Sequence, residues 1–266
     1  MGNIMELEIT DLLISPQTGN SLELSGDGRA LVAANSGERF PIVDGMPDFM
    51  AGEALSQLDK EAINWFDLMG VAFSYDWRLK WMFWRKGISE KEMRLDCLNR
   101  LEIMEGGRVL ETSVGTGTNL QYFPTSTQFF GLDISWKMLR YCQRKIKRWG
   151  REATLFRANA SERLPFIDHA FDVVFHMAGI QYFDDPAGAV REMIRVAKPG
   201  TRIVVADQPS TTAQTLSRVA GSRGSYNNLD EAIADLPAML PPGMTEIEAA
   251  LISQGELYCL SFRTPV

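Results

Sequence analysis

Residues 109–120 read VLETSVGTGTNL, and this stretch decides how the chain folds. Its apolar start is typical of a strand, while Gly115 and Gly117 predict a tight turn that leads into a helix near Asn119. A glycine turn after a strand lets the backbone approach a ligand closely. A dinucleotide, the phosphates of a nucleotide and a ligand without phosphate are all compatible with such a turn.

The residues around the two glycines separate these ligands. A phosphate-binding P-loop needs a Lys after its last glycine, and none follows here. A dinucleotide fingerprint needs a third glycine where this chain has Leu120, which counts against that ligand without excluding it. Glu111 precedes Gly115 at the expected end of the strand. A carboxylate there suits a positively charged amino group, and S-adenosylmethionine (SAM) carries such a group beside an adenosine.

Strand-like and helical segments alternate from residue 108 onward. The strand-like stretches are 108–113, 128–135, 153–160, 171–178 and 201–207. Ser135 caps a basic helix that runs to about Arg148, and Asp185-Pro186 opens a helix that ends at AKPG. Residues 245–253 and 256–265 predict a closing antiparallel pair. The alternation predicts an α/β fold with a doubly wound, mainly parallel, seven-stranded Rossmann-like sheet and a ligand at the carboxyl ends of the strands.

Five elements in this order resemble the class I SAM-dependent methyltransferases over roughly residues 60–266. VLETSVGTGTNL is similar to their first motif, and GLDIS ends the second strand in Asp133, the acid that binds the ribose in this family. RANASERLPFIDHAFDVVF and EMIRVAKPGTRIVVAD are similar to the adenine-side and fifth-strand elements. FSYDWRLKWMF resembles the Y-D element of ubiquinone- and menaquinone-type members.

The resemblance implies SAM as the cofactor and a set of residues that bind it. Ser113 departs from the family's first glycine, and Asn159 departs from its usual Asp, although an Asn carbonyl can still accept a hydrogen bond from adenine. The cofactor-binding residues implied are Tyr75, Glu111, Ser113, Gly115, Gly117, Asn119, Asp133, Ile134, Met138, Asn159 and Ala160.

The acceptor side is less clearly marked in the sequence. His176 follows the fourth strand, where it is a candidate general base, with substrate contact or plain packing equally compatible. Tyr182 and Asp184, in the next loop, are candidates for substrate contact. Phe73, Trp77, Trp81 and Trp84 form one helical stripe, for which we expect core or interdomain packing rather than a lid over an apolar substrate. Trp77 and Trp81 are the substrate-binding candidates of that second interpretation.

Residues 1–50 form a small β-rich domain with Gly, Pro and Asn turns. Its SPQTG opening and its GERFPIVDGMPDFM end resemble the zinc-ribbon-like domain of tRNA-methyltransferase activators. Ser15, Thr18, Asn35 and Ser36 occupy the region where cysteines are expected, so a ribbon here would bind no metal. We expect a helical cap region over residues 51–105, including a helix that begins at Ser89 and ends at Gly106-Gly107. The SAM-binding domain would cover residues 106–266.

The formal net charge of −7 weakens any interpretation with nucleic acid as the main partner. It also disfavours a membrane-surface helix. We find no signal peptide pattern and no stretch approaching about 20 apolar residues, so we expect a cytoplasmic protein without a membrane partner. The leading hypothesis is methyl transfer to a small molecule, without a metal and with homodimer formation left open. A nucleotide-dependent oxidoreductase and a non-catalytic SAM-binding module that acts through a protein partner are the alternatives.

Overall fold

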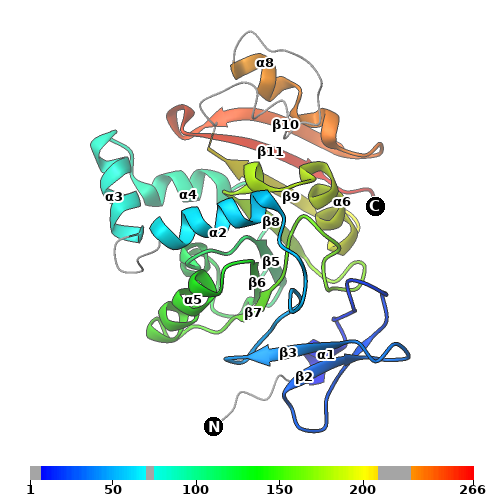
Figure 1. Cartoon of the computed structure of the whole chain (residues 1–266). Coiled ribbons are helices and arrows are strands. Elements are labelled where there is room, and N and C mark those ends of the chain that lie inside the picture. Colours follow the sequence, from blue (N-terminus) through cyan, green and yellow to red (C-terminus); the bar gives the residue numbers. More distant parts are fainter. Residues whose placement is uncertain (1–6, 70–74, 209–228) are drawn as a thin grey trace.

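A seven-stranded sheet forms the centre of the protein in the computed structural model, which describes residues 7–69, 75–208 and 229–266 (Figure 1). The strand order is β10-β11-β9-β8-β5-β6-β7. The five strands β5 to β9 pair in parallel, and β11 pairs antiparallel with β9 and β10. Their bounds are β5 Arg108–Thr112, β6 Gln128–Asp133, β7 Thr154–Arg157, β8 Val173–Met177, β9 Arg202–Asp207, β10 Thr245–Ile252 and β11 Leu257–Arg263. The predicted sheet is confirmed.

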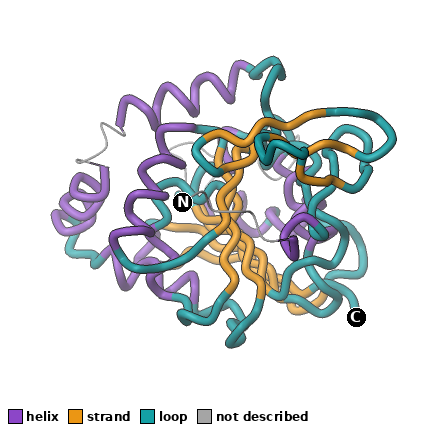
Figure 2. The backbone as a smooth tube through the Cα atoms, turned by 90° about the horizontal axis from the view of Figure 1, so that it is seen from below, coloured by secondary structure: helices purple, strands orange, loops and turns teal. Residues whose placement is uncertain are grey.

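Both faces of this sheet are buried because neighbouring strand residues point to opposite sides. Leu110 and Val174 pack in one apolar cluster with α6 (Pro186–Val196), whereas Val109 and Val173 pack in a second cluster with α4 (Glu90–Leu98) and α5 (Trp136–Arg148). Seen from below, the strands run through the centre with helices on both sides (Figure 2). Such double coverage explains the nearly continuous apolar runs of the parallel strands.

The predicted helix starts are confirmed, but two helices are shorter than expected. Ser135 caps α5 and Asp185 caps α6, each accepting a backbone hydrogen bond at its cap. The helix opened by Ser89 ends at Leu98 rather than near residue 105, because the N–H groups of Arg100 and Leu101 bond back only three residues in tight turns. The glycine turn leads into a single 3₁₀ helix, η1 (Thr118–Tyr122).

The remaining described elements complete the two ends of the chain. At the N-terminal end they are α1 Leu7–Thr10, β1 Leu22–Leu24, β2 Ala30–Ala33, β3 Arg39–Val43, β4 Met46–Pro47, α2 Gln57–Met69 and α3 Tyr75–Arg85. Toward the C-terminus they are η2 Ile180–Tyr182, α8 Leu229–Ala234, η3 Leu236–Met239 and η4 Ser253–Gly255.

Strands β1 to β4 form a separate antiparallel sheet, whose apolar residues nevertheless share a core with the large sheet. The ring of Phe49 lies 5.0 Å from that of Phe40 and 6.2 Å from that of Phe156 in β7, measured between ring centroids. Next to this contact, Asp48 forms a buried salt bridge of 3.2 Å with Arg157. Residues 12–49 therefore pack as part of the main body.

Ser15, Thr18, Asn35 and Ser36 occupy the region where a zinc ribbon would have its cysteines. Three of them surround a carboxylate in this protein. The hydroxyls of Ser15, Thr18 and Ser36 donate to Oε2 of Glu38 over 2.9, 2.7 and 2.8 Å. These three bonds lower the pKa of Glu38. Asn35 takes a left-handed turn conformation with φ of 70°. Within the described ranges, no group of three or more His, Cys, Asp or Glu side chains could hold a metal ion.

Helices α2, α3 and α4 lie within residues 51–105, where a helical cap region is expected. The expectation that the aromatic stripe packs inside the protein is wrong for the three described tryptophans, because Trp77, Trp81 and Trp84 are 65%, 45% and 73% exposed. Phe83 of α3 is buried, at 1% exposure. Phe73 lies outside the described residues. No helix in the described part of the chain combines the length and apolarity needed to cross a membrane.

Candidate functional site

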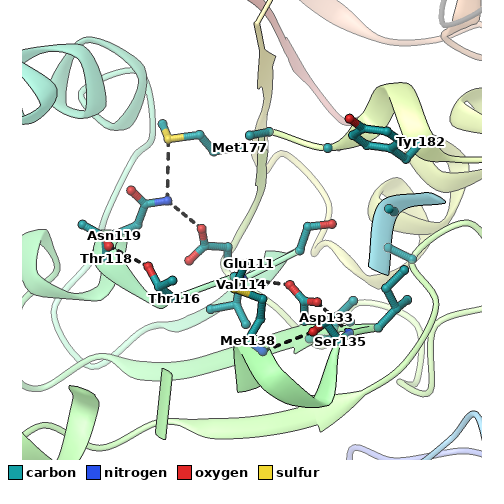
Figure 3. Close-up of a pocket in the computed structure, with 18 of the residues that line it drawn as sticks. Glu111, Val114, Thr116, Thr118, Asn119, Asp133, Ser135, Met138, Met177 and Tyr182 are labelled. Atoms are coloured by element: carbon teal, nitrogen blue, oxygen red, sulfur yellow. Dashed lines mark hydrogen bonds between the residues drawn. The ribbon is translucent and has the colours of Figure 1, made fainter. Parts of the chain in front are cut away.

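A pocket lies at the carboxyl ends of β5, β6 and β8, where the strand order changes direction (Figure 3). Strand β5 has β6 on one side and β8 on the other, so the loops that follow these strands diverge and leave a crevice between them. The cap helices α2, α3 and α4 also contribute lining residues, namely Asp59, Ala62, Ile63, Phe83, Met93 and Arg94.

Glu111, the fourth residue of β5, lies fully buried at the pocket wall. Its Oε1 accepts a hydrogen bond of 2.6 Å from Nδ2 of Asn119, whereas its Oε2 has no partner among the described residues. Burial raises the pKa of Glu111 to about 8. An unpaired buried carboxylate oxygen is costly unless a ligand satisfies it, and an ammonium group would do so. The residue thus fits the amino group of SAM.

Asn119 connects Glu111 to a cation that sequence reasoning missed. Its Oδ1 accepts a hydrogen bond of 2.7 Å from Arg94, whose guanidinium also pairs with Glu90 at 2.9 Å. Figure 3 shows the Asn119 side chain between Glu111 and Met177. Arg94 lines the pocket, and nothing in the sequence motif indicates it because it belongs to a helix that precedes the first strand.

The first part of the glycine turn lines the pocket, whereas its second glycine packs against α5. Ser113 and Gly115 both line the pocket with positive φ angles of 64° and 53°. A Cβ on Gly115 would meet no atom within 4 Å, so this residue leaves open space beside the pocket. A Cβ on Gly117 would lie 2.5 Å from Sγ of Cys142 in α5. Gly117 therefore allows close packing of α5, and it does not line the pocket as the predicted cofactor contact would.

Asp133 ends β6 and lines the pocket beside Ile134 and Met138, as predicted. Its two carboxylate oxygens accept backbone hydrogen bonds of 2.9 Å from Gly115 and from Ser135. These bonds fix the carboxylate against the glycine turn. A carboxylate fixed at this place is the kind of acceptor that a pair of ribose hydroxyls requires.

Asn159 and Ala160 also line the pocket, but Asn159 has partners that the sequence did not reveal. Its carbonyl accepts a hydrogen bond of 2.9 Å from the backbone of Ser161. Its amide lies 3.3 Å from a carboxylate oxygen of Asp59, a buried residue of α2 that also lines the pocket. A capping box with Ser56 holds Asp59 at the start of this helix.

The residues predicted to contact the acceptor differ in whether they line the pocket. Tyr182 lines the pocket, together with Phe183 and Gly179. Asp184 is exposed and does not line it, and neither do Trp77 and Trp81. The side chain of Tyr75 lies outside the described residues, so its predicted contact with the cofactor stays a prediction.

The structure does not support His176 as a general base. Its imidazole is fully buried inside the sheet, where Nδ1 lies 3.0 Å from Oγ1 of Thr112, and it does not line the pocket. Burial lowers the pKa of His176 to about 4, because a charged imidazolium is poorly solvated there. The loop after β8 does border the pocket, as expected for this fold. His176 itself is buried in the core and does not reach the pocket.

A second buried acid anchors the acceptor-side loop. Asp207 ends β9 and accepts a backbone hydrogen bond of 2.9 Å from Gly179. Further backbone N–H groups of Ile180 and Gln181 also stabilise its carboxylate, while burial raises its pKa to about 6. Asp207 thereby holds the segment that carries Tyr182 next to the pocket. It acts as a positioning residue because it does not line the pocket itself.

Comparisons with known proteins agree with this geometry. A family described as a methyltransferase domain matches residues 110–205. Phosphatidylethanolamine N-methyltransferase of Cereibacter sphaeroides is 30% identical over 159 residues, which cover 58% of this chain and 77% of that protein. Demethylmenaquinone methyltransferase of Anoxybacillus flavithermus is 27% identical over 165 residues, which cover 60% of this chain and 64% of that protein. The match thus spans less than two thirds of this quinone methyltransferase.

Solved structures support the fold. The cyclase SpnF matches with a TM-score of 0.53 and 18% identity over 67% of this chain and 82% of that one. A chain from the complex of the Haloferax volcanii Trm112 methyltransferase activator with a putative methyltransferase also gives a TM-score of 0.53, with 19% identity over 76% of this chain and 98% of that one.

These matches decide between the hypotheses for the glycine turn. The matched residues 110–205 contain the turn, Glu111, Asp133 and the loop after β8, which are the parts that build the pocket. The oxidoreductase alternative has no support among the relatives described above. SAM is the cofactor, and the chain belongs to the class I SAM-dependent methyltransferases.

Proposed function

We propose that this methyltransferase transfers the methyl group to a small-molecule acceptor that has a large apolar part and supplies its own nucleophile. The observation that carries the proposal is the contrast between the two halves of the pocket. Charged and hydrogen-bonding side chains gather around the glycine turn and form what we call the polar half. The other lining residues are mainly apolar and form what we call the apolar half, which includes Ala62, Ile63, Phe83, Met93, Phe183 and Leu257.

The polar half would hold the cofactor, which supplies an activated sulfonium methyl group when bound. The free oxygen of Glu111 would accept from the amino group, and Arg94 would pair with the carboxylate. Asp133 would accept from the ribose hydroxyls. Asp59 and Asn159 would contact the adenine edge. Each of these side chains already lines the pocket, so binding needs little rearrangement of the described residues.

The apolar half would hold the acceptor and exclude water, which is the main catalytic contribution such a transfer needs. The titratable residues among the described lining residues are Asp59, Arg94, Glu111, Asp133 and Tyr182. Burial and nearby acids raise the pKa of Tyr182, so its phenol stays protonated at neutral pH and does not act as a base. We therefore infer an acceptor that is nucleophilic without help, such as an amine or an easily ionised hydroxyl or carbon acid.

The named relatives support this substrate class. One is named for N-methylation of phosphatidylethanolamine and another for methylation of demethylmenaquinone. Both acceptors combine a reactive head with a large apolar part, which is compatible with a pocket of this composition.

The test has two steps. Calorimetric titration with S-adenosylhomocysteine should show binding, and no binding at millimolar ligand would contradict the proposal. Methyl transfer from labelled SAM should then favour apolar amines and phenols over polar ones of the same head group. Tight cofactor-product binding with no transfer to any acceptor would favour the non-catalytic alternative instead.

A further inference from the structure

Helix α3 carries an exposed stripe of three tryptophans, which we call the Trp face: Trp77, Trp81 and Trp84. At about 100° per residue, these three side chains leave the helix within about 60° of one another. All three are at least 45% exposed. Figure 1 shows α3 at one extreme of the molecule, projecting beside α4. So much indole surface in water is unfavourable unless something covers it.

Basic residues flank the Trp face. The segment 75–86 holds four basic residues and one acidic residue, so it is positive although the whole chain is negative. Lys80 and Arg85 are both exposed and, by the same helical geometry, lie on either side of the tryptophans. The guanidinium of Arg85 lies 4.8 Å from the ring centroid of Trp81.

The opposite side of the same helix faces the pocket. Phe83 projects more than about 100° away from the Trp face, is 1% exposed and lines the pocket. Helix α2 also borders the pocket, through Ala62, and its Trp65 is 52% exposed. One layer of helix thus separates the apolar half of the pocket from the exposed tryptophans.

We propose that the Trp face docks onto the surface of an anionic lipid bilayer. Tryptophan prefers the boundary between headgroups and acyl chains, and flanking Lys and Arg reach lipid phosphates from that depth. The net charge of −7 is a weak objection, because salt screens charges beyond about 8 Å and the docking segment is itself positive. A protein partner would also cover indole rings, but the positive flanks favour a phosphate-covered surface.

Docking would place the pocket wall next to the bilayer and allow an acceptor dissolved in the membrane to reach it. This functional part rests on the proposed apolar acceptor, whereas the docking itself does not. The negative net charge alone disfavours a membrane-surface helix. The local positive charge of α3 outweighs it at the short distances over which charges interact in salt.

The experiment is vesicle flotation of the full-length protein without any acceptor. Vesicles of phosphatidylcholine with one quarter phosphatidylglycerol should bind the protein at least tenfold better than phosphatidylcholine alone. The triple variant W77A/W81A/W84A and the charge reversal K80E/R85E should each bind anionic vesicles at least tenfold less well. Two matched controls, M104A/I247A for exposed apolar surface and R29E/R39E for exposed charge, should bind like the unmodified protein.

Several results would overturn docking. They are the absence of binding to anionic vesicles, equal binding to neutral ones, or undiminished binding by the charge-reversal variant. A dimer in solution that the triple tryptophan variant abolishes would assign the face to a second copy of the chain. Titration of every preparation with S-adenosylhomocysteine separates the proposals: intact ligand binding without vesicle binding rejects docking alone, whereas no ligand binding by the unmodified protein rejects the proposed function.

Discussion

The side-chain amide of Asn119 lies 2.6 Å from Oε1 of Glu111 and holds that carboxylate from one side only. The other oxygen, Oε2, is buried and has no partner among the described residues. Burial of this carboxylate makes Glu111 prefer its protonated form in the free protein and raises its pKa to about 8. A ligand ammonium would reverse that preference, which couples cofactor binding to pH.

Cofactor binding should therefore release a proton. At pH 7 about nine tenths of Glu111 is protonated in the free protein, and the ammonium binds the ionised form. Affinity for S-adenosylhomocysteine should rise by nearly tenfold per pH unit from pH 6 and level off above pH 8. Calorimetry in two buffers of different ionisation enthalpy measures the release. Affinity independent of pH over this range would contradict the assignment.

The variant E111Q tests the same carboxylate by removing its charge. It should weaken binding by about 1–3 kcal/mol, the scale for a hydrogen bond to a charged group, and it should abolish the proton release. Because the folded-state pKa lies above the usual 4.5, the free protein loses stability as pH rises from 4.5 to about 8. E111Q should thus melt higher than the unmodified protein at pH 8. The exposed Glu23, as E23Q, is the matched control for both measurements.

Asp59 should contribute to adenine recognition although it lies in a cap helix. The variant D59N should bind S-adenosylhomocysteine about tenfold less well, because the pocket loses a charged acceptor beside Asn159. It should also lose its preference over S-inosylhomocysteine, which lacks the adenine amino group. E61Q, on the exposed side of α2, should keep both properties. If D59N kept the preference, the adenine edge would have to be read by Asn159 alone.

Ser113 should store backbone strain at the family's glycine position. Its φ of 64° is a left-handed conformation, which costs a residue with a Cβ roughly 1–2 kcal/mol. S113G should therefore raise the midpoint of thermal unfolding by about 2–4 °C per kcal/mol gained. S113A retains the Cβ and should show no such gain, so an equal gain in both variants would locate the effect in the lost hydroxyl instead.

His176 should affect acid stability without controlling the pH dependence of catalysis. Burial lowers its pKa from 6.5 to about 4, so folding stability is lost as pH falls through that interval. In H176N the loss between pH 6.5 and 4, followed by thermal unfolding, should be smaller. The pH profile of methyl transfer between pH 6 and 8 should keep its shape. A lost ionisation in that profile would restore the catalytic assignment.

The sequence predicted the parts of the protein that local patterns determine. Strand alternation gave the sheet, and Ser135 and Asp185 marked helix starts because capping depends on neighbouring residues. The pocket residues on the first two parallel strands followed from motif spacing. Arg94 and Asp59 could not be found in this way, because their pocket contacts join segments far apart in the chain.

The wrong expectations have a common physical cause. The tryptophan stripe and His176 were both judged from one-dimensional patterns that do not say which side of an element faces the core. In α3 Phe83 is buried, whereas Trp77, Trp81 and Trp84 are exposed. In β8 the side chain of His176 lies on a buried face of the sheet that α-helices cover. It does not line the pocket.

The N-terminal sheet also connects to the cofactor pocket through Arg157. Arg157 pairs with Asp48 on one side, while its Nε donates over 3.1 Å to the carbonyl of Ile134, a pocket residue. A fragment that starts after residue 50 would leave this guanidinium unpaired and uncover the rings around Phe156. The N-terminal sheet therefore stabilises a segment that lines the pocket. Its loss should loosen the ribose and adenine end of a site to which it contributes no lining residue.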